Sequence, residues 1–225
     1  MAPVLAAIAV AAAYLLGAVP FGLIVCLPLG RDPRTVGSGR TGGTNVYRTA
    51  GMPAALLTVA GDILKGYVAL WLAARLVPAD LGPGPHAWAV ALAALAVIVG
   101  HNYSVFTGFA GGAGSSPNIG AILWLDPLGF AAAFALGAAV LFGVRIASLA
   151  SLVASSTVLA AVAWRVSTGT LPPATLVYGV GQLALVAWAL RPNLARLRAG
   201  TERRLQFGRP PSAPPAPDPR AEPRA

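Results

Sequence analysis

Residues 3–29 read PVLAAIAVAAAYLLGAVPFGLIVCLPL and contain no charged side chain. An α-helix needs about 20 apolar residues to cross a bilayer, so this stretch predicts a membrane span. No basic residue precedes the apolar run and no convincing cleavage site follows it, which favours an uncleaved first span over a signal peptide. We therefore expect the fold to be built inside a membrane.

The composition of the chain supports an integral membrane protein. Of its 225 residues, 56% are hydrophobic and 10% charged, whereas soluble domains carry about 25% charged residues. Basic residues outnumber acidic ones by 16 to 7, but no aromatic–basic stripe accompanies them, so we expect no nucleic acid partner. Cys26 is the single cysteine and the two histidines are far apart, so we expect neither a disulfide framework nor a metal site, and no cofactor.

Further apolar runs predict further helices, at residues 52–77, 86–103, 115–125, 128–142, 147–164 and 171–190. The run 115–125 is too short to cross a bilayer and suits a re-entrant or buried half-helix. The predicted fold is an all-α integral membrane protein with about seven transmembrane or re-entrant helices, or about six if that short run does not count.

The arginines predict the orientation, because cytoplasmic loops carry the excess of basic residues. With seven passes, most arginines fall on one side, which predicts an outside N-terminus and a cytoplasmic C-terminus. These arginines are Arg31, Arg34, Arg40, Arg48, Arg145, Arg191, Arg196 and Arg198. We expect a polytopic membrane domain over residues 1–200 and a disordered, Pro- and Arg-rich cytoplasmic tail over 201–225.

Between the first two spans, residues 37–48 read GSGRTGGTNVYR. Glycines permit positive φ, so successive amides can form an anion-binding nest. The stretch adds hydroxyls, one amide and two guanidinium groups, which are good partners for phosphate. We interpret it as a phosphate-binding loop; the alternative is a flexible cytoplasmic loop whose arginines only set the topology.

A second motif at residues 100–114 reads GHNYSVFTGFAGGAG and ends at a predicted helix N-terminus. A glycine turn that enters a helix N-terminus can bind an anion, although small residues also serve close helix packing in membranes. His101 is either part of a site or a satisfied interfacial histidine.

Ionisable residues inside or beside the predicted spans are also candidate site residues. Asp62 and Lys65 lie three apart in the second span and so share one helix face. Such groups face a polar site, or neutralise each other and hold helices together. Arg145, just before Ser148, either binds an anionic substrate or marks the cytoplasmic side.

In order and spacing, these motifs resemble those of the bacterial acyl-phosphate:glycerol-3-phosphate acyltransferases, a family of small inner-membrane enzymes. Members look like GSxxFG, GSGNxGATNxxR, DxxKG, GHxxPVFxxFxGGKG, an arginine before SLAS, and HRENxxRL. This chain has GAVPFG (17–22), GSGRTGGTNVYR (37–48), DILKG (62–66), GHNYSVFTGFAGGAG (100–114), RIASLAS (145–151) and RPNLARL (191–197).

The resemblance implies a seven-span enzyme of the bacterial inner membrane whose active site faces the cytoplasm. It implies acyl transfer from acyl phosphate to glycerol 3-phosphate, giving lysophosphatidate for phospholipid synthesis. The expected partners are these two substrates and membrane lipid, and we expect a monomer. A substrate phosphate accepts the proton in the chemistry proposed for the family.

The resemblance also implies the site. Ser38, His101 and Arg145 are the expected catalytic residues. The expected residues for substrate or phosphate binding are Gly37, Gly39, Arg40, Gly43, Thr44, Asn45, Arg48, Lys65, Gly111, Gly112, Gly114, Ser148, Asn193 and Arg196.

The chain also departs from the family pattern. Ala113 stands where the family has lysine, Arg40 replaces asparagine, and Ser104 replaces proline. Leu190 and Pro192 replace the final histidine and glutamate. Loss of a cation beside the reacting group costs about 10²–10³ in rate, unless Arg40 substitutes for it. The alternative function is therefore a degenerate paralogue that binds phosphate or lipid in a regulatory role; a transporter has less support, because no inverted repeat is visible.

Overall fold

The structure is a computed structural model and describes residues 1–208. All of its regular elements are helices, as predicted. The α-helices are α1 Ala2–Ala18, α2 Phe21–Cys26, α3 Gly43–Ala50, α4 Met52–Leu76, α5 Pro83–Asn102, α6 Ser115–Leu125, α7 Pro127–Gly143, α8 Ala147–Ser167, α9 Thr175–Ala189 and α10 Arg191–Arg198. Short 3-10 turns lie at η1 Leu27–Leu29, η2 Pro33–Thr35, η3 Ala79–Leu81 and η4 Val105–Thr107.

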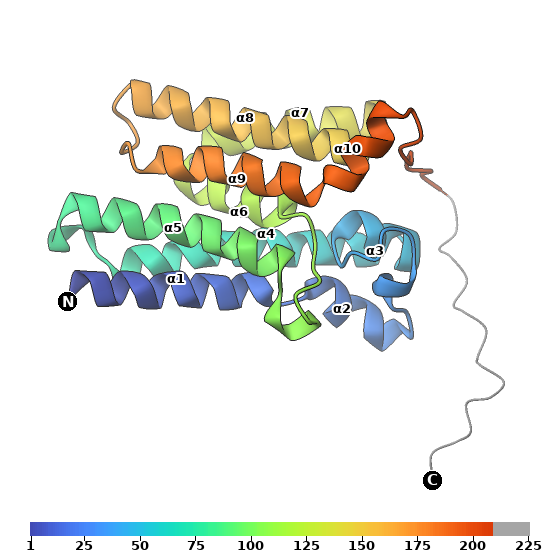
Figure 1. Ribbon diagram of the computed structural model, residues 1–225, viewed down its shortest axis with the longest axis horizontal. Helices are drawn as coiled ribbons and strands as arrows, with labels where there is room; N and C mark the ends of the chain where they lie inside the picture. Colours follow the sequence, from blue (N-terminus) through green and yellow to red (C-terminus); the bar gives the residue numbers. More distant parts are fainter. Residues whose placement is uncertain (209–225) are drawn as a thin grey trace, which may run out of the picture.

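The long helices run side by side in two groups (Figure 1). Helices α1, α4 and α5 form one half and α7, α8 and α9 the other, while α6 lies between them and packs on both α4 and α7. Helices α3 and α10 lie at the same end of the bundle, and the N-terminus lies at the opposite end (Figure 1). Motifs far apart in the sequence therefore meet at one end of the molecule.

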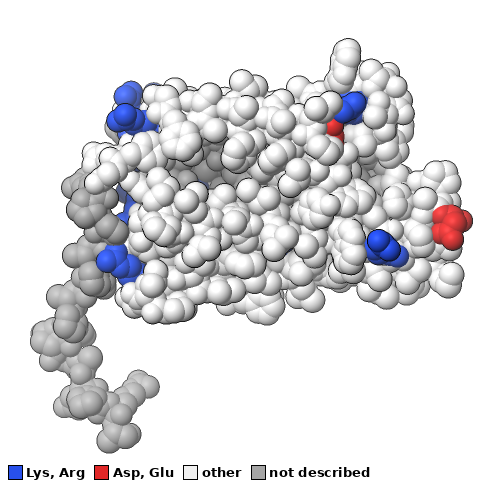
Figure 2. All heavy atoms as spheres, turned by 180° about the vertical axis from the view of Figure 1, so that it is seen from behind, with Lys and Arg blue, Asp and Glu red and all other residues white. Residues whose placement is uncertain are grey.

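The helices are apolar enough for a membrane. Four candidate spans are Ala2–Leu29, Met52–Leu76, Pro83–Thr107 and Ala147–Ser167, and α7 and α9 are shorter apolar helices. On the face in Figure 2, basic and acidic atoms gather at the two ends and leave an uncharged surface between them. The chain is thus an all-helical integral membrane protein, while the number and direction of its crossings stay predictions.

The first predicted span is interrupted in the structure. Helix α1 ends at Ala18 and α2 begins after Pro20, because proline has no N–H to continue the helical bonds. The carbonyl groups freed at the break gain partners from elsewhere: Lys65 Nζ donates to Val19 O at 2.9 Å, and Ser104 Oγ donates to Ala18 O at 2.6 Å. The break therefore gives the polar side chains of α4 and the α5–α6 connection their backbone partners.

Glycines allow the helices to approach closely. A Cβ at Gly66 of α4 would lie 2.1 Å from the carbonyl oxygen of Pro117 in α6, and one at Gly120 would lie 1.9 Å from that of Ile63. Small residues at a membrane helix interface allow this contact. The buried helix α6 matches the predicted half-helix 115–125.

The described part of the predicted tail, residues 201–208, packs on the bundle. Leu205 is buried, and its N–H donates to Arg145 O at 2.7 Å. Contacts between this segment and the bundle continue to Gly208. Residues 209–225 of the predicted tail lie outside the described residues, so the predicted boundary between membrane domain and tail at residue 200 stays a prediction.

Candidate functional site

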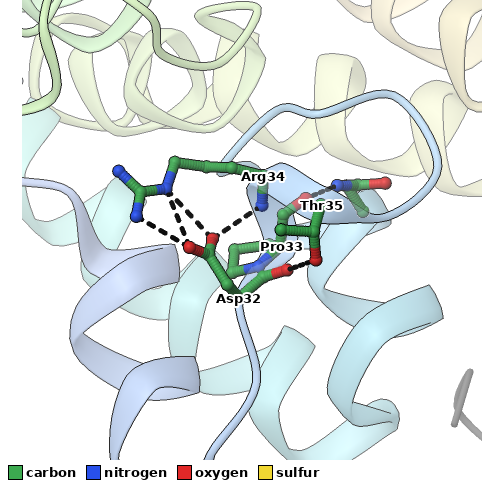
Figure 3. A network of polar contacts seen from close by, with 5 residues as sticks. Asp32, Pro33, Arg34 and Thr35 are labelled. Atoms are coloured by element: carbon green, nitrogen blue, oxygen red, sulfur yellow. Dashed lines mark hydrogen bonds and ion pairs between the residues drawn. The ribbon is translucent and has the colours of Figure 1, made fainter. Parts of the chain in front are cut away.

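The first loop is folded around local hydrogen bonds (Figure 3). Asp32 Oδ1 accepts from the backbone N–H of Arg34 at 2.9 Å and its carboxylate pairs with the Arg34 guanidinium, while Thr35 Oγ1 donates to Asp32 O. The hydrogen bond from Arg34, which outweighs slight burial, lowers the pKa of Asp32. These bonds give the loop a defined entry into the glycine-rich stretch.

Asn45 of α3 holds the backbone of this loop through hydrogen bonds of its side-chain amide. Its Nδ2 donates to the carbonyl oxygens of Pro33, Val36 and Arg40 at 2.6, 3.0 and 2.9 Å, and its Oδ1 accepts from Ser38 N at 3.1 Å. The structure uses the Asn45 amide within the loop, and its expected contact with phosphate stays a prediction. Its observed role is to position the loop backbone.

The glycines follow the predicted nest only in part. Gly37 and Gly39 have positive φ of 61° and 70° on either side of the exposed Ser38. Gly42 is extended, with φ −80°, and Gly43 is the first residue of α3. A Cβ at Gly37 would lie 3.5 Å from Arg48 Cδ, so the aliphatic part of the Arg48 side chain packs against the loop. Thr44, in the first turn of α3, is half-buried.

Arg40 connects the loop to the other half of the bundle. Its guanidinium donates to Asn193 Oδ1 at 3.0 Å and to the carbonyl oxygen of Ala189. Asn193 Nδ2 in turn donates to Glu202 Oε1 at 2.7 Å. The loop, α9, α10 and the C-terminal segment are therefore linked through one chain of polar contacts.

Glu202, which sequence reasoning missed, is the centre of a cluster of predicted site residues. Its carboxylate accepts from Ser148 Oγ at 3.1 Å, Asn193 Nδ2 at 2.7 Å and Arg196 Nε at 2.8 Å. We call Arg40, Ser148, Asn193, Arg196 and Glu202 the rim. An acidic residue shortly after Arg196 was the only sequence signal, and it lay in the segment predicted as a tail.

The electrostatics of the rim favour an anion. Burial works to raise the pKa of Glu202, but the hydrogen bonds from Asn193, Arg196 and Ser148 outweigh it and lower the pKa. Burial, and then the nearby Arg196, lowers the pKa of Arg40. Arginine stays charged in proteins, so several guanidinium groups surround one carboxylate and leave a net positive field.

Arg48 extends this positive field. Burial, and then Arg203, lowers the pKa of Arg48, while Glu202 opposes the shift. Arg48 of α3 and Arg203 of the C-terminal segment therefore lie within electrostatic reach of Glu202. The predicted phosphate residue Arg48 thus belongs beside the rim.

The predicted site residues Arg145, between α7 and α8, and Ser148, in α8, lie at the same end of the bundle as the rim. Arg145 is exposed and occupies a left-handed conformation, with φ 64°, in the turn before α8. Ser148 is buried and donates to Glu202. The structure thus brings Ser148 into the rim and places Arg145 beside the C-terminal segment that carries Glu202.

The glycine turn forms a second part of the site. Gly112 N donates to His101 O at 3.0 Å, and a Cβ at Gly112 would lie 2.0 Å from His101 Nε2. Gly114 has φ 80° and is the N-cap of α6. The predicted helix N-terminus after a glycine turn is confirmed, with Ala113 half-buried within the turn.

Two polar side chains beside this turn were also missed by sequence reasoning. Both amide atoms of Asn102, and the hydroxyl of Ser115 in the first turn of α6, are buried without a hydrogen-bond partner among the described residues. A Cβ at Gly114 would lie 3.0 Å from Asn102 Oδ1. Buried polar groups normally have partners, so this helix N-terminus is a candidate for a polar ligand.

His101 and Lys65 are buried away from the surface. Lys65 Nζ lies 2.7 Å from Asp62 Oδ1 and 2.9 Å from His101 Nδ1. An ammonium can only donate, so Nδ1 accepts and the ring proton is assigned to Nε2, on the side of Gly112. The sequence predicts Lys65 as a phosphate ligand, whereas the structure neutralises it with Asp62. It also places His101 as a support for the glycine turn, and a catalytic role for this histidine stays a prediction.

Comparisons with known proteins identify the family of this chain. The family described as "Glycerol-3-phosphate acyltransferase" matches residues 7–200. A glycerol-3-phosphate acyltransferase of Bordetella pertussis is 42% identical over 197 residues, which is 86% of this chain and 88% of the relative. One from Roseiflexus sp. is 39% identical over 208 residues, 92% of this chain and 98% of the relative.

Solved structures have the same fold. The crystal structure of PlsY, an integral membrane glycerol 3-phosphate acyltransferase, in its glycerol 3-phosphate form superposes with a TM-score of 0.79 at 31% identity. The match covers 89% of this chain and 96% of that one. The lysophosphatidic acid form gives a TM-score of 0.78 at 30% identity, covering 89% and 95%. The resemblance carried by the motifs is confirmed: this chain belongs to the glycerol-3-phosphate acyltransferase family.

Proposed function

We propose that this protein is an acyltransferase that moves a fatty acyl group from acyl phosphate to glycerol 3-phosphate and so makes lysophosphatidate. The observation that carries the proposal is the rim, and membership of the glycerol-3-phosphate acyltransferase family supports it. One related structure is described as the glycerol 3-phosphate form and the other as the lysophosphatidic acid form. Both ligands pair a phosphate with glycerol oxygens, which suits arginines beside mixed polar groups.

The rim is the proposed site of glycerol 3-phosphate. Its phosphate would pair with Arg40 and Arg196 of the rim and with Arg48 beside it, since guanidinium groups bind phosphate through paired, charge-assisted hydrogen bonds. Its hydroxyls need donors and acceptors, which Ser148 and Asn193 provide. Ser38 of the first loop and Thr44 of α3 supply further hydroxyls at the same end.

The glycine turn is the proposed site of the acyl phosphate headgroup. Backbone amides at the start of α6 are available to an anion, because a helix leaves its first N–H groups without intrahelical partners. The buried amide of Asn102 and hydroxyl of Ser115 supply further polar contacts there. The apolar bundle beside the turn suits the acyl chain of a lipid-derived donor.

The reaction then proceeds by direct acyl transfer. A glycerol hydroxyl oxygen attacks the acyl carbonyl carbon, the new C–O ester bond forms, and the bond between the acyl carbon and the phosphate oxygen breaks. Inorganic phosphate leaves and takes the hydroxyl proton. Glu202 is a poor base here, because its lowered pKa and its hydrogen bonds hold it as a carboxylate with occupied oxygens.

The proposed location is the inner membrane of a bacterium, with the rim on the cytoplasmic face. The clustering of arginines at the end that carries α3 and α10 supports this orientation. The protein is proposed to act as a monomer, since the rim is assembled from one chain.

The test is acyl transfer by the purified protein reconstituted in lipid. Palmitoyl phosphate and labelled glycerol 3-phosphate should give labelled lysophosphatidate, whereas palmitoyl-coenzyme A in place of palmitoyl phosphate should give none. Product from the thioester alone would contradict the donor. Product from neither, with folding confirmed by a monodisperse elution profile, would contradict the function.

One observation favours a second candidate, a paralogue without turnover that binds phosphate or lipid. Ala113 brings no cation to the glycine turn, where the family motif GGKG has lysine. The variant Ala113→Lys separates the two candidates. Product from Ala113→Lys alone would indicate an intact pocket that has lost catalysis, while product from the unmodified protein would indicate that another cation, with Arg40 the first to test, replaces the lysine.

A further inference from the structure

The C-terminal segment, residues 201–208, crosses the end of the bundle that carries the rim. Thr201 N donates to Arg196 O at 2.8 Å, and Glu202 accepts from the rim residues. Further along, Leu205 is buried and Phe207 is half-buried. The segment is therefore attached at its start to α8 and α10, in one half of the molecule.

An aromatic contact attaches the other end of the segment to both halves. The Phe207 ring lies between Tyr47 of α3, with centroids 5.8 Å apart, and Phe142 of α7, with centroids 5.3 Å apart. The Tyr47 hydroxyl donates to Gln206 O at 3.0 Å and accepts from Gly208 N at 3.2 Å. We call Tyr47, Phe142 and Phe207 the aromatic clamp.

The segment also contacts the strained turn before α8. Arg145 and Phe109 are the non-glycine residues with positive φ among residues 1–208. Such a backbone conformation is strained and persists only when the surrounding structure enforces it. The N–H of Leu205 donates to the Arg145 carbonyl at 2.7 Å, so the clamped segment helps to hold the turn from which Ser148 enters the rim.

These contacts connect the clamp to the rim. Phe207 fixes the far end of the segment, Leu205 its middle, and Glu202 its start. Loss of the clamp would leave the segment held by one half only, and the groups that Glu202 gathers would lose part of their fixed geometry. Binding sites depend on such support, because a preorganised site loses less free energy in ordering itself around a ligand.

We infer that Phe207, held between Tyr47 and Phe142, is a positioning residue that keeps the C-terminal segment across the rim and thereby sets the affinity for glycerol 3-phosphate. The inference rests on the proposed function. It assigns Phe207 no contact with the reacting atoms, so its effect falls on KM for glycerol 3-phosphate. The glycine turn lies outside the clamp, and KM for acyl phosphate is expected to stay unchanged.

The test compares full-length variants for both KM values and for kcat. Phe207→Ala removes both ring contacts of the clamp and should raise KM for glycerol 3-phosphate roughly three- to tenfold. Phe207→Tyr keeps the ring and should stay within about twofold of the unmodified protein. Phe134→Ala removes an exposed ring elsewhere on α7 and is the matched control, expected to behave as the unmodified protein.

A second variant keeps the test decisive if Phe207→Ala does not fold. Tyr47→Phe keeps the ring but removes the hydroxyl that contacts Gln206 and Gly208, and it should raise the same KM by about two- to fivefold. The inference is overturned if KM is unchanged in a folded variant, if only kcat falls, or if Phe207→Tyr is as impaired as Phe207→Ala.

The same comparison separates this inference from the proposed function. If the unmodified protein makes no lysophosphatidate, the proposed function fails, and equilibrium binding of labelled glycerol 3-phosphate replaces KM as the readout. Weaker binding by Phe207→Ala would then still support the positioning role. Equal binding, or no binding by the unmodified protein, would overturn it.

Discussion

At the scale of single residues, the buried Asp62–Lys65 pair and the rim have opposite electrostatic properties. Asp62 and Lys65 are buried and neutralise each other within the bundle. The rim instead gathers guanidinium groups around the single carboxylate of Glu202. The first arrangement is suited to holding helices together, and the second to attracting a phosphate.

The buried pair predicts a stability effect. Asp62→Ala leaves the buried Lys65 ammonium without its counter-ion, which should cost about 3–5 kcal/mol of folding free energy. Asp62→Ala with Lys65→Met removes both charges and should recover part of that loss. Thermal unfolding in detergent measures both variants. A double variant less stable than Asp62→Ala would contradict the neutralising role.

Glu202 predicts a dependence on pH. Because its pKa is lowered in the folded protein, its contribution to stability is fully present above the ordinary glutamate value of about 4.3 and is lost as pH falls through the lower folded value. The difference in melting temperature between the unmodified protein and Glu202→Gln should be constant at neutral pH and shrink in acid. A difference that grows on acidification would contradict the hydrogen-bonded carboxylate.

At the scale of elements, glycine contacts set the distances between helices. Gly66 and Gly120 bring α4 and α6 together, and Gly100 of α5 packs against the Tyr14 carbonyl of α1. Through these contacts α4 and α5 present Lys65 and His101 to each other, and α6 begins beside Asn102. Helix spacing thus determines the geometry around the glycine turn.

This packing predicts unequal effects of two glycine substitutions. Gly66→Ala would place a methyl group 2.1 Å from the Pro117 carbonyl and should destabilise the protein by about 1–3 kcal/mol through overpacking. Gly84→Ala, in the first turn of α5 with no neighbour within 4 Å, is the matched control. Equal melting temperatures for the two variants would argue against close packing of α4 on α6.

The elements show how far the sequence predicts this structure. Apolar run length placed α4, α5, α6, α7, α8 and α9 correctly, because hydropathy reflects the bilayer. It did not show the break at Pro20, where average hydropathy stays high. The segment 201–208 is polar and was predicted as disordered, yet single side chains such as Leu205 and Phe207 tie it down through contacts distant in sequence.

The sequence predicted which residues gather at the site better than it predicted where their side chains point. Arg40, Arg48, Ser148, Asn193 and Arg196 lie at one end of the bundle, as their motifs indicated. Residue type does not show where a side chain points, so the inward amide of Asn45 and the buried ammonium of Lys65 required the structure.

At the scale of the whole molecule, charge is divided between two ends (Figure 2). The end with α3 and α10 carries the rim. The other end carries the Asp126–Arg165 ion pair, with Arg165 Nη2 2.8 Å from Asp126 Oδ1. If the rim end is cytoplasmic, the soluble substrate glycerol 3-phosphate reaches the rim from the cytoplasm. The soluble product, inorganic phosphate, is released to the same side.

This orientation predicts a labelling pattern. Thr35→Cys in a Cys26→Ser background places an exposed thiol at the rim end and should resist membrane-impermeant thiol reagents until the cells are permeabilised. Asp80→Cys, exposed at the opposite end, is the matched control and should be labelled in intact cells. Labelling of position 35 in intact cells would reverse the proposed orientation.

Equilibrium binding of labelled glycerol 3-phosphate to the purified protein tests whether this substrate binds at the rim. Arg48→Ala should weaken binding at least about tenfold, because it removes a charge-assisted partner of the phosphate. Arg75→Ala, which removes an exposed arginine beside Trp71 on α4, should bind as the unmodified protein does. Unchanged binding by a folded Arg48→Ala variant would contradict binding at the rim.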